Sequence, residues 1–431
     1  MSLKSIIQNR VVRHLFGIEQ RNGKRRQAER KRRAANAPHI VAYFHEAGDP
    51  YSHLMVQVLP EFCARYEVEL QVYVVSPPPD WAAPDRGRLE DYARKDAERL
   101  ARRAGLAFSN PGKQPSDVQL AEANAALIMA VEGGVFLERA ADIGRRLWAG
   151  QGGDFESAAL TKIAHSLADA AKRREANGHY LGATLFYAGE WYWGVDRLHY
   201  LESRLTELGA AMDARDEPIF APPIVPSAAP LHSCASGSQL HWYLSFRSPY
   251  TGIVAERVKA LADAHGAEIK LRFVLPMVMR GMQVPRAKGF YIMRDAVREA
   301  ERMGIPFGNM RDPVGEPVER GYAILHRAIE MGKGLEFAKS FLSGVWAEGL
   351  DAGSDRGLRT ITERAGLSWS DMKPLIGGDH WRADAEANQQ EMFRHGVWGV
   401  PSFRVGDVVA WGQDRLWLIE EALVAEATEK K

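Results

Sequence analysis

The chain has 431 residues, which is too many for one ordinary hydrophobic core, so we expect at least two domains. A formal net charge of +1 points to no charged partner by bulk electrostatics, and a hydrophobic content of 46% is typical of globular proteins. No apolar run approaches the roughly 18 residues of a membrane span, and the N-terminal sequence lacks the uninterrupted apolar core of a secretory signal.

The chain contains two cysteines, Cys63 and Cys234, and neither belongs to a Cys-x-x-Cys motif. Dithiol exchange of the thioredoxin kind therefore has no residues to carry it. Cys63 falls on the apolar spacing of a predicted helix and is interpreted as a core residue, whereas Cys234 lies in a predicted linker. No feature supports a disulfide between them, so a reducing, cytoplasmic compartment is the simpler interpretation.

Residues 1–37 form a strongly basic tail, with Lys and Arg clustered at residues 24–26 and 30–33. Two interpretations are open: a solvated, partly helical tail, or a surface that binds anionic lipid or nucleic acid. No aromatic residues are interleaved with these charges, which favours the solvated tail and argues against nucleic acid as a partner.

Residues 38–211 are predicted to form a first domain. Residues 39–44 are rich in β-forming types, Asp49 and Pro50 begin a helix, and residues 68–75 form the next strand. Residues 86–178 are predicted to be mostly helical. The proline-rich residues 212–238 show no apolar period and are predicted to be a linker.

Residues 239–428 are predicted to form a second domain with the same order of elements. Residues 242–246 read as a strand, Ser248 and Pro249 begin a helix, and residues 269–275 alternate as the next strand. A helical insertion follows these elements.

The end of the second domain is the most informative stretch of the chain. Residues 403–405 and 408–411 are short β-rich runs around a Gly-Asp turn, and Pro401 opens the first of them. Gln413 or Asp414 can cap the helix that follows.

The two halves match at four places, in the same order and at similar spacing. The matched pairs are Asp49-Pro50-Tyr51 with Ser248-Pro249-Tyr250, Tyr92 and Asp96 with Tyr291 and Asp295, residues 105–110 with 304–309, and residues 193–198 with 411–416. A tandem duplication of one fold is the best account of this pattern. Each copy is predicted to be an α/β thioredoxin-like core that is split by a helical insertion.

The sequence Gly-Val-Pro before an edge hairpin resembles the C-terminal half of a thioredoxin fold. Residues 411–416, Trp-Gly-Gln-Asp-Arg-Leu, are similar to the 2-hydroxychromene-2-carboxylate isomerase family and its kappa-class glutathione transferase relatives, within the DsbA-like group. The resemblance implies two tandem DsbA-like domains, with good motifs in the second half and weak ones in the first. It further implies glutathione as cofactor and an aromatic or conjugated small molecule as substrate. Such domains often pair as dimers, so two arrangements are open: a homodimer, or a covalent repeat that replaces this pairing.

Two classes of function are therefore open. One is a glutathione-dependent isomerase or transferase, and the alternative is a non-catalytic DsbA-like binding or scaffold protein. The weak motifs of the first half favour the alternative.

Ser248 is the predicted catalytic residue. Serine at the N-cap before proline is an ordinary helix start. The same position can serve chemistry, because a helix N-terminus carries about half a positive charge and stabilises a thiolate. The resemblance implies that the Ser248 hydroxyl donates a hydrogen bond to the glutathione sulfur, so that no protein cysteine is needed.

The resemblance also assigns the cofactor-binding residues. It implies that the Val400–Pro401 peptide bond is cis and that the Val400 backbone pairs with the cysteinyl backbone of glutathione. It places the γ-glutamyl ammonium against Asp414 and the γ-glutamyl carboxylate against nearby N–H groups, including that of Gln413. Arg415 either pairs with Asp414 or lies near the ligand.

The helical insertion is expected to close over the site. Tyr250 and Asn309 are the predicted substrate-binding residues, although a loop-capping role accounts for Asn309 equally well. The insertion is also rich in methionine, which suits an apolar aromatic substrate, and in arginine, which can receive a carboxylate. These residues are Met277, Met279, Arg280, Met282, Arg286 and Met293.

Both halves depart from the family pattern. The second half lacks the strand aspartate that the family carries where Ser245 or Phe246 falls. In the first half Asp49 replaces the serine, and a carboxylate there repels a thiolate; Thr184 is taken to replace the proline. We therefore expect only the second domain to hold glutathione. We also expect no metal site, because the histidines do not have the spacing of metal ligands.

Overall fold

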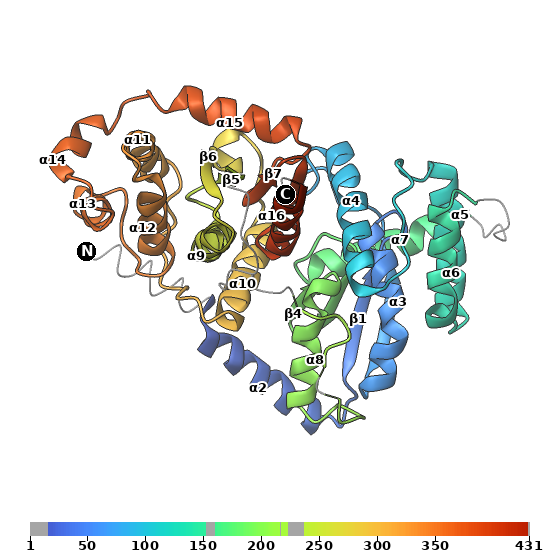
Figure 1. Cartoon of the computed structure of the whole chain (residues 1–431). Coiled ribbons are helices and arrows are strands. Elements are labelled where there is room, and N and C mark those ends of the chain that lie inside the picture. Colours follow the sequence, from blue (N-terminus) through green and yellow to red (C-terminus); the bar gives the residue numbers. More distant parts are fainter. Residues whose placement is uncertain (1–15, 152–159, 216, 223–236, 430–431) are drawn as a thin grey trace. The chain divides into compact units, whose positions relative to one another are not determined.

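A computed structural model describes residues 16–151, 160–215, 217–222 and 237–429 (Figure 1). The chain divides into two compact units. The N-terminal unit comprises Asn22–Pro222 with Pro285–Tyr291, and the C-terminal unit comprises Met1–Arg21, Pro223–Val284 and Ile292–Lys431. Cys234 and most of the predicted linker lie outside the described residues, as do the first 15 residues of the basic tail.

The N-terminal part of the chain is built from seven helices, four strands and one 3₁₀ turn among the described residues. In chain order they are α2 (Ile18–Ala34), β1 (Ile40–His45), α3 (Pro50–Arg65), β2 (Glu69–Val74), α4 (Arg86–Ala104), α5 (Asp117–Glu132), α6 (Phe136–Trp148), α7 (Leu160–Ala176), β3 (Thr184–Tyr187), β4 (Glu190–Trp193), η1 (Val195–Arg197) and α8 (Leu198–Glu207).

The rest of the described chain follows the same plan with a longer insertion. Its elements are β5 (Gln239–Leu244), α9 (Pro249–Ala264), β6 (Glu268–Phe273), η2 (Met277–Arg280), α10 (Arg286–Arg302), α11 (Glu316–Glu330), α12 (Gly334–Trp346), α13 (Asp355–Arg364), α14 (Trp369–Met372), η3 (Lys373–Leu375), α15 (Arg382–Arg394), β7 (Ser402–Val405), β8 (Val408–Trp411), η4 (Gln413–Arg415) and α16 (Leu416–Glu429).

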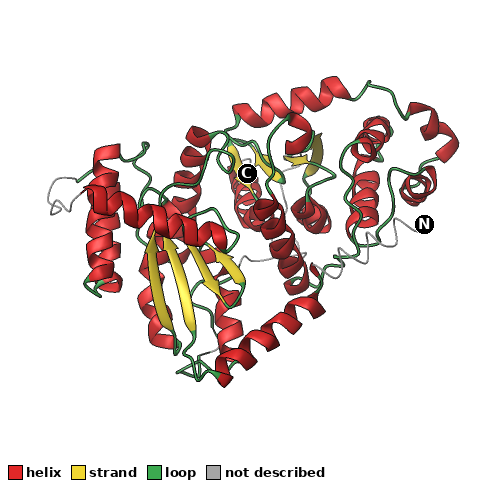
Figure 2. Ribbon diagram, turned by 180° about the vertical axis from the view of Figure 1, so that it is seen from behind, coloured by secondary structure: helices red, strands yellow, loops and turns green. Residues whose placement is uncertain are grey.

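Each unit contains one four-stranded sheet with the same topology. The strand orders are β2-β1-β3-β4 and β6-β5-β7-β8. In both sheets the first two strands in the chain pair in parallel, and the last two form an antiparallel hairpin joined to the central strand. Figure 2 shows the strands of the N-terminal unit side by side, with helices on both faces. The structure thus confirms the prediction of two tandem thioredoxin-like domains.

The central strand of each sheet explains why its sequence is so apolar. Every residue of β5 after Gln239 is buried, and four of the six residues of β1 are buried. A strand that is covered on both faces by helices reads as a continuous hydrophobic run rather than as an alternating one. Buried aromatic side chains from these strands, such as Tyr43 and Trp242, form much of the core.

The repeated motifs occupy equivalent places in the two units. The hydroxyl of Tyr51 donates to Asp96 Oδ2 at 2.8 Å, and the hydroxyl of Tyr250 donates to Asp295 Oδ2 at the same distance. Phe108 contacts Trp148, and Phe307 contacts Trp346, at ring-centroid distances of 5.4 and 5.9 Å. The internal duplication read from the sequence therefore extends to matched side-chain contacts.

The register of the hairpins corrects one assignment. Thr184 lies opposite Trp193 in β3–β4, and Ser402 lies opposite Trp411 in β7–β8. Thr184 is therefore the counterpart of Ser402, and Ala183, not Thr184, stands where the second half has Pro401. The assignment of Thr184 to the proline position is therefore wrong by one residue, because Thr184 is already the first residue of the strand β3.

Cys63 is half-buried on α3 rather than fully in the core. Burial raises the pKa of its thiol to about 11, so the thiol stays protonated at neutral pH. A protonated thiol is a poor nucleophile, so Cys63 is not poised for thiol–disulfide exchange. Within the described part of the chain, no helix is both long and apolar enough to cross a bilayer.

Candidate active site

Ser248 lies at the N-cap of α9 and joins it to the loop before β7. Its Oγ accepts a hydrogen bond from the Thr251 N–H at 3.2 Å and donates one to the Val400 carbonyl at 3.1 Å. The side chain is half-buried, so it remains within reach of a ligand. The structure thus brings together two predicted site residues that are 152 positions apart in the sequence.

The loop that carries Val400 is held rigidly in place. The Val400–Pro401 peptide bond is cis. The Ser402 hydroxyl donates to the Gly399 carbonyl at 2.8 Å, and the ring of Trp398 lies 4.6 Å from that of Trp411. A Cβ at Gly399 would collide with the Trp411 indole, so this close approach requires glycine.

Gln413 and Asp414 lie next to α9. They form the 3₁₀ turn η4, which directly precedes α16, and α16 begins at Leu416. Gly412 adopts φ +111°, and an added Cβ would lie 2.6 Å from Asp414 Oδ1, so glycine is needed to let the turn fold back.

A buried polar chain fixes the side chain of Gln413. Its Nε2 donates to Glu299 Oε2 at 2.6 Å, and the half-buried Arg257 donates to both its side-chain and its backbone oxygen. Burial lowers the pKa of Arg257 to about 10, which leaves it charged at neutral pH. Because these hydrogen bonds engage the Gln413 side chain, only its backbone can bind a ligand. Arg415 lies 3.5 Å from Asp414, which matches the pairing interpretation of that residue.

A second polar contact supports the loop between β5 and α9. The Tyr322 hydroxyl lies 3.5 Å from Ser245 Oγ and donates to the Val274 carbonyl at 2.6 Å. Ser245 is 1% exposed, and its carbonyl accepts from the Ser248 N–H at 3.0 Å. A neutral hydroxyl pair thus occupies the region where the family pattern has an aspartate.

Arg280 is the residue whose importance the sequence did not single out. One of its terminal nitrogens donates to the Trp398 carbonyl at 3.1 Å, two residues before Val400. Within the described structure, its Nε and Nη1 are buried and have no hydrogen-bond partner. Burial lowers its pKa to about 10, so the group remains a cation beside the cis-proline loop. Only the tertiary structure separates Arg280 from the other arginines of the insertion.

The two predicted substrate-binding residues differ in how their side chains are engaged. The Tyr250 hydroxyl is committed as a donor to Asp295. Asn309 is half-buried in the loop that docks on Trp346, where the Gly308 N–H donates to the Trp346 carbonyl at 3.0 Å. The Trp346 indole in turn donates to the Phe246 carbonyl at 3.0 Å and packs against Gly252, in the first turn of α9. Asn309 therefore lies on a segment that is anchored next to the Ser248 helix.

The equivalent place in the N-terminal unit holds carboxyl groups. Asp49 caps α3 and accepts from the Tyr51 and Ser52 N–H groups and from the Ser52 hydroxyl. Burial raises its pKa to about 6. Burial, and then the charge of Asp49, raises the pKa of Glu46 well above its usual range. A Cβ at Gly182 would lie 2.9 Å from Glu46 Oε2 and 3.2 Å from Asp49 Oδ2, so both carboxyl groups fill the space beside this glycine.

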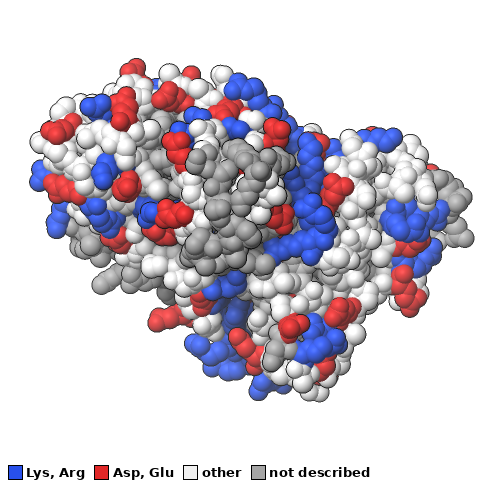
Figure 3. Space-filling view, in the orientation of Figure 1, with Lys and Arg blue, Asp and Glu red and all other residues white. Residues whose placement is uncertain are grey.

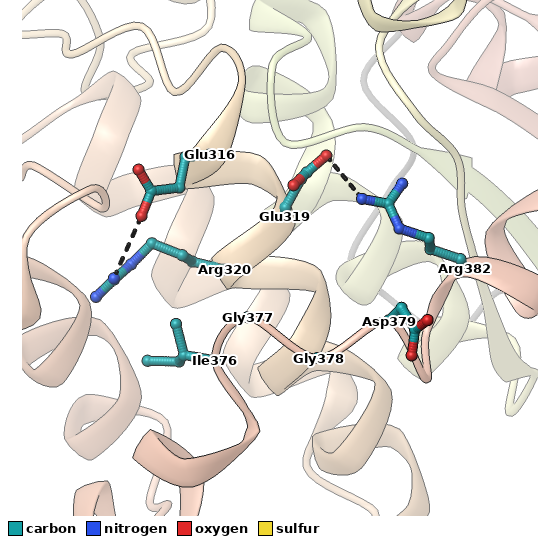
Figure 4. Close-up of a pocket in the computed structure, with 8 residues that line it drawn as sticks. All are labelled: Glu316, Glu319, Arg320, Ile376, Gly377, Gly378, Asp379 and Arg382. Atoms are coloured by element: carbon teal, nitrogen blue, oxygen red, sulfur yellow. Dashed lines mark hydrogen bonds and ion pairs between the residues drawn. The ribbon is translucent and has the colours of Figure 1, made fainter.

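A small hollow elsewhere in the C-terminal unit does not overlap the predicted site. It lies between the start of α11 and the loop before α15 (Figure 4), and its lining residues are Glu316, Glu319, Arg320, Ile376, Gly377, Gly378, Asp379 and Arg382. Glu319 pairs with Arg382 at 3.1 Å, and Glu316 lies 3.7 Å from Arg320. These mutual ion pairs mark a surface network. No group of His, Cys, Asp and Glu among the described residues is arranged to hold a metal.

The sheet order, the N-cap serine and the cis-proline loop are those of a thioredoxin-fold domain. Residues 239–424 match the family described as DSBA-like thioredoxin domain. The second half of the chain is thus similar in sequence to DsbA-like domains.

Its relatives include enzymes named 2-hydroxychromene-2-carboxylate isomerase. The protein of that name from Pseudomonas putida is 21% identical over 190 residues, covering 42% of this chain and 92% of the relative. The one from Pseudomonas sp. (strain C18) is 23% identical over 190 residues, covering 42% and 88%.

Among solved structures, a 2-hydroxychromene-2-carboxylate isomerase is 20% identical with a TM-score of 0.39, covering 44% of this chain and 97% of that one. The cytosolic disulfide reductase DsbM from Pseudomonas aeruginosa, solved with GSH, is 16% identical with a TM-score of 0.34, covering 44% and 97%.

Proposed function

We propose that the C-terminal unit binds glutathione and uses it to isomerise, or to conjugate, an aromatic or conjugated small molecule. The observation that carries this proposal is the hydrogen bond from Ser248 Oγ to the Val400 carbonyl. It joins a hydroxyl donor at the positive end of α9 to the backbone of the half-buried Val400 in the cis-proline loop. Each of these groups suits one part of a thiol-bearing peptide.

The Ser248 hydroxyl has a second acceptor available once a thiol peptide binds. The cysteinyl N–H of such a ligand would donate to the Val400 carbonyl, as in an added β-strand. That exchange releases the Ser248 hydroxyl, which can turn to donate to the sulfur, while the Thr251 N–H still holds its oxygen. The site thus stabilises a thiolate through one hydrogen bond and the helix charge.

The remaining groups suit the rest of such a ligand and its co-substrate. Asp414 is half-buried and offers a carboxylate for an ammonium group. Arg280 has two side-chain nitrogens, Nε and Nη1, that find no hydrogen-bond partner among the described residues, and its guanidinium beside the same loop suits a carboxylate on the substrate. Glutathione bound here supplies a thiolate nucleophile that adds to an electron-poor carbon. Expulsion of the thiolate after rotation about a bond of the adduct gives isomerisation, whereas retention of the carbon–sulfur bond gives a conjugate. The relatives named isomerases support this type of reaction.

Calorimetric titration of the full chain with reduced glutathione tests the proposal. We expect about one ligand per chain and release of protons on binding near neutral pH, because the site favours the thiolate. The proton release is measured by repeating the titration in buffers of different ionisation enthalpy. S-Methylglutathione, which has no thiol, is the control and should bind without releasing protons. No binding of glutathione at millimolar concentration would contradict the proposal and favour a scaffold role.

A further inference from the structure

The chemistry proposed for the C-terminal unit does not account for the basic helix α2. Residues 1–37 contain 11 Lys and Arg and 2 Glu, a net charge of +9. Because the whole chain carries +1, residues 38–431 carry −8. Positive and negative charge are therefore strongly separated along the chain, although the total is nearly balanced. A basic segment of this kind can attract an anionic partner.

Three of the arginines on α2 are used within the N-terminal unit. Arg25 forms a two-pronged ion pair with Glu190, with N–O distances of 2.6 and 2.7 Å. Arg32 and Arg33 both pair with Glu29 on the same helix, and the Arg32 hydrogen bond contributes most to lowering the pKa of Glu29 to about 2. The Arg25–Glu190 pair joins the helix to the strand β4, and the other two pairs engage the carboxylate of Glu29 within the helix.

The opposite face of α2 presents basic groups without partners. Lys24, Arg26, Arg30 and Lys31 are exposed, and no ion pair or hydrogen bond of their side chains occurs in the described structure. At about 3.6 residues per turn, they fall with Arg33 within one half of the helix circumference. Figure 3 shows Lys and Arg side chains gathered at the lower edge of the view, where Figure 1 places α2.

We propose that this face of α2 docks the protein on an anionic lipid surface. A lipid surface is favoured over nucleic acid by the neighbouring sequence, which carries Leu3, Ile6, Ile7, Val11, Val12 and Leu15 within 15 residues. Reversible membrane anchoring combines a polybasic segment with an apolar one, whereas phosphate-backbone binding has no use for the apolar residues. The exposed face of α2 also lacks aromatic side chains that would stack on bases.

Vesicle co-sedimentation of the full chain tests this proposal. Each Lys or Arg near an anionic bilayer contributes a factor of roughly five to binding at low salt. We expect binding to vesicles of phosphatidylcholine with 30% phosphatidylglycerol, no binding to pure phosphatidylcholine, and loss of binding at high salt. The variant K24E/R26E/R30E/K31E should bind at least about a hundredfold more weakly.

The control variant K113E/R139E/K333E/R356E has the same change in net charge at exposed residues elsewhere and should bind like the wild type. Equal losses in both variants would show only a net-charge effect and overturn the proposal. It would also be overturned if the wild type failed to bind anionic vesicles at low salt, or if a DNA or RNA duplex bound more tightly than vesicles and displaced them. If K24E/R26E/R30E/K31E did not fold, the Gln versions of the same four positions give the same comparison.

Discussion

The two halves of the chain present the same backbone at the helix N-terminus and opposite chemistry. In the C-terminal unit the N-cap is Ser248, and its hydroxyl donates to the carbonyl of the facing loop. In the N-terminal unit the N-cap is Asp49, whose carboxylate takes the N–H groups of the first turn for itself. The facing loop residue is Val400 in one unit and Gly182 in the other.

The comparison shows that the fold sets the backbone arrangement but not the chemistry at the helix N-terminus. Both units keep the Tyr–Asp pair and the turn from the hairpin into the last helix, with Gly194 and Gly412 donating to the carbonyls of Ala183 and Pro401 at 2.8 and 2.9 Å. The positive end of a helix is present in both. A buried carboxyl pair cancels that charge in one unit, whereas a neutral hydroxyl leaves it available in the other.

The largest expected effect comes from S248A. A hydrogen bond to a charged group contributes about 1.5 to 3 kcal/mol, so we expect the thiol-dependent rate to fall roughly tenfold to a hundredfold. The pKa of the bound glutathione thiol, followed by thiolate ultraviolet absorbance, should rise. D49N is the matched control because it changes the equivalent N-cap of the other unit. If D49N impaired glutathione binding as much as S248A, the assignment of the site to the C-terminal unit would be wrong.

Periodicity and turn residues were sufficient to predict most of this fold. The central strands, the N-caps of α3 and α9, and the hairpin around Gly406 all lie where local sequence preference places them. Two features were missed because they depend on tertiary packing. The equivalence of Ala183 with Pro401 requires the strand register, and the 3₁₀ turn before α16 requires Gly412 to fold onto Asp414.

The site was predictable only in outline, for the same reason. Ser248 and Pro401 stand out in the sequence because N-caps and strand prolines have recognisable local patterns. Arg280 does not stand out, since its role depends on burial and on the Trp398 carbonyl 118 residues away.

The second prediction tests whether proline at position 183 is enough to create a glutathione site in the N-terminal unit. Ala183 has φ +51°, a left-handed conformation that proline cannot adopt, and its N–H donates to Ser52 Oγ at 2.9 Å. We therefore expect A183P to lower the free energy of unfolding by more than about 1 kcal/mol, measured by denaturant titration. A183G, which relieves the strain, should be neutral or slightly stabilising. A stable A183P protein that bound two glutathiones per chain would refute the asymmetry.

The third effect is a pH dependence that belongs to the N-terminal unit. The pKa of Asp49 is about 6 in the folded protein against an ordinary value of 3.8. Folding therefore takes up a proton, and this group lowers stability progressively as the pH rises from about 4 to about 6. D49N keeps an N-cap oxygen and removes the charge, so it should stabilise the protein above pH 6 by on the order of 1 to 3 kcal/mol.

Thermal unfolding at pH 4 and pH 8 measures the difference. The stabilisation by D49N should be much smaller at pH 4 than at pH 8, because at pH 4 the wild-type carboxyl is protonated in the folded state and partly protonated in the unfolded state. E46Q should behave in the same direction, because burial also raises the pKa of Glu46. If D49N raised the stability by the same amount at both pH values, the stabilisation would come from packing and not from removal of the carboxyl charge.

The smallest effect concerns the pair that the two units share. Tyr51 and Tyr250 donate to Asp96 and Asp295 with the same geometry. Each Tyr→Phe change removes a hydrogen bond to a carboxylate and should cost about 1 to 3 kcal/mol of stability, similar for Y51F and Y250F. Because the Tyr250 hydroxyl proton is committed to Asp295, we expect the ring rather than the hydroxyl to contact the substrate. The KM of Y250F for the aromatic substrate should then stay within about threefold of the wild-type value, which steady-state kinetics can measure. A tenfold rise in KM in Y250F that Y51F does not share would show that the hydroxyl itself binds the substrate.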